Sequence, residues 1–111
     1  MAKVRVNWGP APEGCSVNLF DVINTSSNRL LVLARDGQTA MRVAHTANHV
    51  YDPKVTMATY YSRRAEKAVR PFPRSPHFEN LIQIAMARRL EGTVHCDGDK
   101  LFVGEQLITL E

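Results

Sequence analysis

The sequence has few cysteines, no long apolar run and only a mild excess of basic charge. Two cysteines, Cys15 and Cys96, are too few for a disulfide framework, so we expect free thiols in a reducing compartment. No apolar stretch approaches the length of a membrane span, and the first residues have no signal-peptide core. These absences predict a cytoplasmic protein without a membrane partner.

The motifs of the common enzyme classes are also absent. The sequence has no glycine-rich phosphate loop, no paired carboxylates and no serine-triad elbow. Residues 36–39, Asp-Gly-Gln-Thr, are typical of a turn that leads into a helix. We therefore predict a non-enzymatic protein that needs no cofactor.

The composition is that of an ordinary folded domain. Hydrophobic residues make up 44% of the 111 residues and charged residues 23%, which excludes a disordered chain. A chain of this length can bury a core without metal or disulfide bonds. We expect residues 1–111 to form a single compact domain with a basic, Pro/Arg-rich arm at about residues 60–75.

Alternating and short apolar runs predict strands along the chain. Val4, Val6 and Trp8 alternate with polar residues, which indicates a half-buried strand. The run at residues 30–34 suits a buried strand, and residues 9–14 break the pattern as a loop. The expected strands are residues 3–8, 16–23, 30–35, 55–61, 93–96, 100–103 and 106–110.

Two segments have helical periodicity. The first runs from Gln38 to about Tyr51, because small apolar residues recur on one face. Ser75-Pro76 opens the second, with serine as the N-cap and proline at the first helical position, and Gly92 is expected to end it. Residues 62–69 form either a short helix or an irregular arm. The expected buried faces are Ala40, Val43, Ala44, Ala47 and Val50 in the first helix, and Phe78, Leu81, Ile82, Ala85 and Met86 in the second.

The order of these elements predicts the fold class. Three strands precede the first helix, a strand and the arm separate the two helices, and short strands end the chain. This order indicates an α+β fold with a mostly antiparallel sheet of five or six short strands and two main helices on one face.

The basic charge is concentrated in one segment. Between Lys54 and Arg74 six basic residues accompany one acid, Glu66, so this segment has a net charge of +5 and the rest of the chain sums to −2. Guanidinium groups pair with phosphates, and exposed aromatic rings give bases a stacking surface. We therefore predict that the arm contacts nucleic acid or a nucleoprotein complex. The predicted contact residues are Tyr60, Arg63, Arg64, Lys67, Arg70, Phe72 and Arg74.

A second interpretation of the arm needs no partner. Its charges can solvate an exposed linker while its aromatic rings pack inward, and short basic stretches are common on protein surfaces. The two interpretations differ in whether the cationic side chains are presented outward.

His45 and His49 lie four residues apart on the first predicted helix and are candidate metal ligands. Thr46 stands where a metalloprotease helix has its catalytic glutamate, so that chemistry is not supported. A third ligand would have to come from His77, from His95-Cys96 or from a distant acid. A metal-dependent enzyme that uses His45 and His49 is an alternative function, and ordinary surface histidines are the other interpretation.

His95-Cys96-Asp97 is a candidate nucleophile segment. Neighbouring residues on a strand point to opposite faces, so His95 is not placed to activate the Cys96 thiol. A catalytic cysteine would need another histidine, such as His77. The commoner case is a small apolar cysteine in a hairpin.

Residues 62–103 have the order of a winged helix-turn-helix: a short helix, a turn, a second helix and a β-hairpin. A recognition helix should present polar residues to a DNA groove. This one offers mainly Asn80, Gln83 and the Arg88-Arg89 pair.

A protein–protein module is the main alternative function. Residues 81–103, LIQIAMARRLEGTVHCDGDKLFV, resemble the helix and hairpin of the small docking domains at the ends of peptide-synthetase subunits. The size and the order of elements are similar in format to small phage-encoded inhibitors, anti-CRISPR proteins among them. Short strands leave a free sheet edge, through which an inhibitor or adaptor could bind a partner or form a homodimer.

Overall fold

The computed structural model describes residues 5–24, 29–49, 60–64 and 76–110, which form seven strands and two helices. Neither helix of this part is long and apolar enough to cross a membrane. The elements are β1 (Asn7–Pro10), β2 (Asn18–Asn24), β3 (Arg29–Ala34), α1 (Gly37–His49), β4 (Tyr60–Arg64), α2 (Pro76–Ala87), β5 (Leu90–Asp97), β6 (Lys100–Val103) and β7 (Gln106–Ile108).

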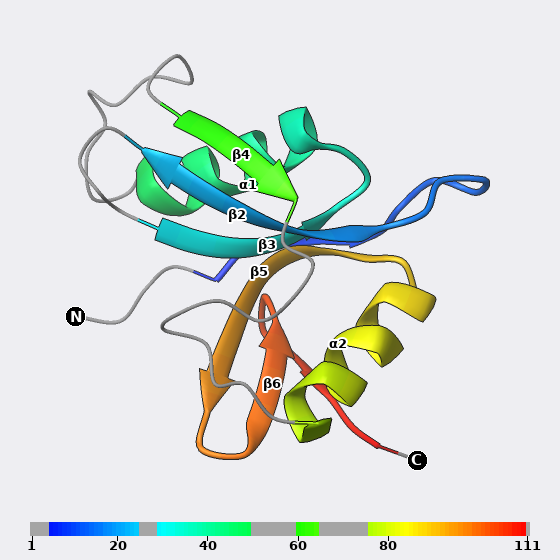
Figure 1. Ribbon diagram of the computed structural model, residues 1–111. Coiled ribbons are helices and arrows are strands. Elements are labelled where there is room, and N and C mark those ends of the chain that lie inside the picture. The colour runs from blue at the N-terminus through cyan, green and yellow to red at the C-terminus, as the bar shows by residue number, and fades with distance from the viewer. Residues whose placement is uncertain (1–4, 25–28, 50–59, 65–75, 111) are drawn as a thin grey trace.

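The described strands pair in an antiparallel sheet. Six of them lie side by side in the order β4-β2-β3-β5-β6-β7, and β1 pairs with β5 off this path. The long strand β5 joins the two halves, because it pairs with β3 near its middle and with β6 toward its end. Figure 1 shows this arrangement. The predicted α+β class with an antiparallel sheet is confirmed.

The two helices cover opposite faces of the sheet, so the prediction of one shared face is wrong. Leu30, Val32 and Ala34 of β3 pack in one cluster with the small residues of α1. Leu31 and Leu33 point the other way and pack in a second cluster with α2. Because β3 is apolar on both faces, it can be buried from both sides. Figure 1 shows α1 beside β2, β3 and β4, and α2 beside β5 and β6.

Both helices bury the faces that their periodicity predicts. In α1 the side chains of Ala40, Val43, Ala44 and Ala47 are buried, and Arg42 is exposed on the opposite side. Small residues let the helix lie close to the sheet. The side chain of Val50 lies outside the described residues. In α2 the buried residues are Phe78, Leu81, Ile82 and Ala85, with Met86 partly buried.

The end of α2 differs from the prediction. The helix ends at Ala87, and the residue that turns the chain is Arg89, which has a positive φ of 56°. Gly92, the predicted terminator, lies inside β5. A Cβ at that position would collide with the backbone oxygen of Val6. Gly92 therefore serves the close approach of the chain before β1 and not a helix cap.

Two further boundaries are wrong. Gly9 and Pro10 belong to β1, because proline is tolerated in an edge strand and a register shift between Asn7 and Gly9 absorbs the irregularity. Residues 62–64, expected in a helix or an arm, continue β4 by pairing with β2. Residues 65–69, the rest of the short helix that the winged helix-turn-helix interpretation needs, lie outside the described residues. The predicted strand residues 55–59 lie outside the described residues.

Candidate functional site

The predicted partner-binding arm begins in strand β4. This strand ends the path of paired strands, and within the described residues it pairs with β2 alone. Tyr60, Arg63 and Arg64 are therefore residues of an edge strand. The other predicted contact residues, Lys67, Arg70, Phe72 and Arg74, lie outside the described residues.

The register between β2 and β4 distinguishes the two arginines of this strand. The Cα of Arg63 is paired with that of Asp21, and the Cα of Arg64 is paired with that of Phe20. The Asp21 side chain is buried. Position 63 is therefore opposite a buried acid in the sheet register, and position 64 has no acid as its register partner.

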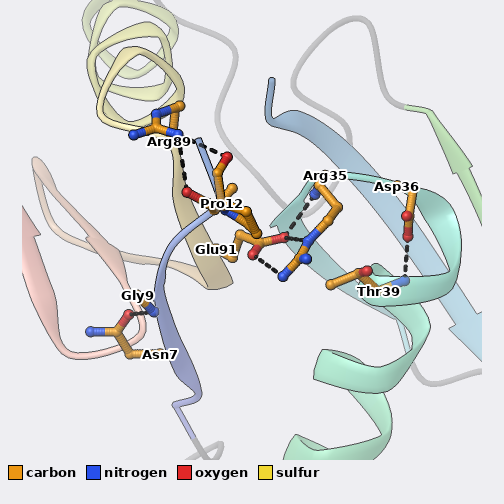
Figure 2. A network of polar contacts seen from close by, with 9 residues as sticks. Asn7, Gly9, Pro12, Arg35, Asp36, Thr39, Arg89 and Glu91 are labelled. Atoms are coloured by element: carbon orange, nitrogen blue, oxygen red, sulfur yellow. Dashed lines mark hydrogen bonds and ion pairs between the residues drawn. The ribbon is translucent and has the colours of Figure 1, made fainter. Parts of the chain in front are cut away.

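A buried ion pair joins β5 to the end of β3. The Glu91 side chain is 1% exposed, and its two oxygens accept hydrogen bonds from the Arg35 guanidinium at 2.8 and 3.1 Å. The same carboxylate accepts the backbone N–H of Arg35 at 2.9 Å. Figure 2 shows the two side chains facing each other beside the start of α1. The hydrogen bond that the Arg35 side chain donates to the Glu91 carboxylate is the main reason why the pKa of Arg35 is raised. This pair ties the end of β3 to β5.

Arg89 ties the loop after β1 to the end of α2. Its Nη1 donates to the carbonyl oxygens of Ala11, at 3.1 Å, and Pro12, at 2.9 Å. Its own carbonyl oxygen accepts from the N–H of Ala11. Figure 2 shows the guanidinium reaching toward Pro12. An open depression of about 640 Å³ lies here, with Cys15 and Met86 in its wall. The Nη1 group of Arg89 is therefore held by the protein's own carbonyl oxygens.

The contacts of His95, His77 and Cys96 favour structural roles. His95 Nε2 lies 2.7 Å from the Thr93 hydroxyl, and His77 Nε2 lies 2.6 Å from the backbone oxygen of Asp99. Neither contact is with the Cys96 thiol. Desolvation raises the pKa of this thiol to about 11, so the reactive thiolate is scarce at neutral pH.

The histidine pair of α1 stands apart from the other candidate metal ligands. His45 is half-buried in α1, and the side chain of His49 lies outside the described residues. Of the predicted third ligands, His77 lies in α2 and His95 in β5, and both have hydrogen bonds of their own. In residues 5–24, 29–49, 60–64 and 76–110 no group of three or more His, Cys, Asp or Glu could hold a metal ion. Metal binding by His45 and His49 stays a prediction.

The structure also brings together a group that sequence reasoning missed. The Arg5 guanidinium lies over the ring of Phe102, 4.6 Å from its centroid. Phe102 is paired with His95 on one side and with Leu107 on the other. The alternation of residues 100–103 could have placed Phe102 opposite the buried Leu101, but no local signal connects it with Arg5, ninety-seven positions earlier in the chain.

We compared the chain with protein-family models, with curated proteins and with solved structures, and none of them matches it. A function can therefore be proposed only from the residues and charges of the chain itself.

Proposed function

We propose that this chain is a non-enzymatic nucleic-acid-binding protein whose arm, residues 60–74, contacts the phosphate backbone. The observation that carries the proposal is the concentration of charge: residues 54–74 have a net charge of +5 against −2 for the rest. Even if the net charge of −2 on the rest of the chain lay entirely against the arm, a net charge of +3 would remain for a partner. Such an excess attracts a polyanion.

The contacts of the folded body support this assignment. The half-buried Arg35 pairs with the buried Glu91, and Arg89 donates to backbone oxygens. These two arginines are engaged within the protein, so the arm is the stronger source of cations for a partner. The start of the arm in an edge strand gives a polyanion access to it from outside the sheet.

The test is a salt titration of nucleic-acid binding. Fluorescence anisotropy of labelled single-stranded and duplex oligonucleotides should show binding at low salt that weakens steeply as salt rises, because bound phosphates release counterions. Five phosphate contacts would weaken the binding about 100- to 500-fold between 50 and 200 mM salt. No binding of either oligonucleotide at low salt would refute the proposal.

Matched variants locate the contact. Arg70→Gln with Arg74→Gln removes two charges from the arm, and Arg42→Gln with Arg88→Gln removes two exposed charges from the helices and their ends. We expect the first pair to weaken binding and to reduce the salt slope by about two contacts. The second pair should change both only slightly. Equal losses in the two pairs would indicate a general charge effect without an arm site.

A protein–protein module is the second candidate function. It is favoured by two exposed apolar side chains at the edge of the sheet, Leu107 at 42% exposure and Leu110 at 53%. Strand β7 ends the path of described strands on this side, so a second chain could pair with it. Light scattering tests the homodimer: a monomer at high protein concentration would count against it.

A further inference from the structure

In the part of the chain that the structure describes, the sheet formed by β5, β6 and β7 has one face covered by α2 and one face left open. Val94, Leu101 and Val103 pack with α2 in the buried cluster. Side chains alternate along a strand, so their neighbours His95 and Phe102 lie on the opposite face. Both are half-buried there, and the next residue in the same row, Leu107, is 42% exposed.

His95, Phe102 and Leu107 form one row across the three strands. His95 is paired with Phe102, and Phe102 is paired with Leu107. Directly opposite side chains in an antiparallel sheet lie within about 5 Å of each other. The row is therefore a continuous strip in which an imidazole, a phenyl ring and an aliphatic side chain lie next to one another.

The open face also has cationic groups beside the ring. The Arg5 guanidinium lies over Phe102, and Lys100 is exposed two residues earlier on the same strand. Asp97 is paired with Lys100 in the register of β5 and β6, so it contributes a carboxylate to the same face. A guanidinium that lies on a ring has a second planar side, on which a further π system can stack.

We propose that this face of β5–β6–β7 binds single-stranded nucleic acid, with a base stacked on the Arg5–Phe102 pair and the neighbouring phosphate near Lys100. The inference rests on the proposed function and assigns the bases to a different surface from the arm. Bases of a single strand have free π faces, which bases inside a duplex do not. A second copy of this chain fits less well, because a two-fold contact of this face would bring two Arg5 and two Lys100 together.

Photocrosslinking locates the base directly. The probe is a single-stranded oligonucleotide with 5-iodouracil, irradiated with the full-length protein and digested with trypsin. Cleavage after Lys100 releases residues 101–111, in which Phe102 is the one aromatic residue. We expect the crosslink in this peptide. Crosslinks confined to peptides from residues 60–74, which contain Tyr60, Tyr61 and Phe72, would overturn the inference while the proposed function stands.

Binding of the same oligonucleotide by variants supplies the second measurement. Phe102→Leu keeps an apolar side chain and removes the ring, and Arg5→Lys keeps the charge and removes the guanidinium plane. Loss of a stacked base weakens binding about 5- to 100-fold. We expect a weakening of this order for Phe102→Leu and a smaller one for Arg5→Lys. Leu110→Ala, an exposed apolar residue after β7, is the control that should leave binding unchanged.

The outcomes separate the two proposals. Variants of the face that bind like wild type, while variants of the arm bind weakly, would overturn the face and leave the arm. A chain that binds no oligonucleotide would overturn both. Circular dichroism confirms that each variant is folded. A dimer in light scattering that Phe102→Leu dissociates would assign the face to a second copy of the chain and overturn the inference.

Discussion

The buried carboxylate of Glu91 accepts three hydrogen bonds from Arg35, which lies 56 positions earlier in the chain. Two come from the guanidinium and one from the backbone N–H. The pair is asymmetric, because the side chain of Arg35 is 35% exposed and that of Glu91 is 1% exposed. Only one of the two groups can turn to water when its partner is lost.

This asymmetry predicts which variant is less stable. Arg35→Ala leaves a buried carboxylate without its cation, whereas Glu91→Gln leaves an arginine that can still reach solvent. We expect Arg35→Ala to lower the free energy of unfolding more than Glu91→Gln. Urea unfolding of both variants at neutral pH measures the two losses, and equal losses would contradict the prediction.

Asp36 caps α1 and makes the stability of the helix depend on pH. Its Oδ1 accepts the N–H of Thr39 at 2.7 Å, and this backbone hydrogen bond is the main reason why the pKa of Asp36 is lowered. Asp36→Ala should cost about 1 kcal/mol at neutral pH. Because the folded pKa lies below the ordinary value of 3.8, this contribution is present above pH 4 and is lost as pH falls toward the lowered pKa. Asp36→Asn, which keeps an acceptor, should retain most of the stability and lose the pH dependence.

Gly104 and Gly98 have nearly the same backbone conformation in different surroundings. Their φ angles are +59° and +63°, but a Cβ on Gly104 would lie 2.6 Å from the Cβ of Asn7, whereas one on Gly98 would meet nothing within 4 Å. Gly98→Ala should cost about 1 kcal/mol for the left-handed conformation alone. Gly104→Ala should cost roughly 1–3 kcal/mol more, because it overpacks the contact with Val6 and Asn7 at the start of β1. Thermal unfolding compares the stability of the two variants. Similar losses of stability would mean that the chain near Asn7 moves aside without cost.

Thr93 holds the N-terminal segment through its hydroxyl group. The Val6 N–H donates to Thr93 Oγ1 at 3.0 Å, and the Thr93 side chain is buried. Thr93→Val keeps the shape and leaves that N–H without its acceptor, so we expect a loss of about 1–3 kcal/mol. Hydrogen exchange of the Val6 amide should become faster. Thr93→Ser keeps the hydroxyl group and should protect this amide better than Thr93→Val; the reverse order would exclude the hydroxyl as the cause.

Cys96 should react slowly with alkylating agents. With a pKa of about 11, its thiolate fraction rises about tenfold per pH unit throughout the neutral range. In a Cys15→Ser variant, which leaves Cys96 as the one thiol, the rate of iodoacetamide alkylation should increase in this way from pH 7 to pH 10. A rate that is already maximal at pH 7 would indicate an activated thiol and revive the thiol-enzyme alternative.

Elements whose pattern is local were predicted well. The small-residue face of α1 and the buried face of α2 follow from helical spacing, and the three C-terminal strands follow from alternation between Gly and Asp turns. The elements that were misplaced depend on distant chain. The sequence predicts a helix terminator at Gly92, because the true role of this glycine, the close approach of Val6, involves residues more than eighty positions away.

The two surfaces proposed to bind nucleic acid also differ in how far the sequence predicts them. Charge counting identifies the arm, because net charge is a sum over the sequence and needs no coordinates. The strip with His95 and Phe102 could not be found by counting, since its members come from three strands whose register sets them side by side.

Periodicity and charge act over a few neighbouring residues, so the chain's own order dictates its helices, most of its strands and its basic segment. The opposite placement of α1 and α2 on β3, the Arg35–Glu91 pair and the position of Arg5 over Phe102 were decided by tertiary contacts. Each of these needs residues from separate segments to meet. Such long-range contacts are stabilised by the burial of the whole core and by the pairing of buried polar groups. No short window of sequence contains this information.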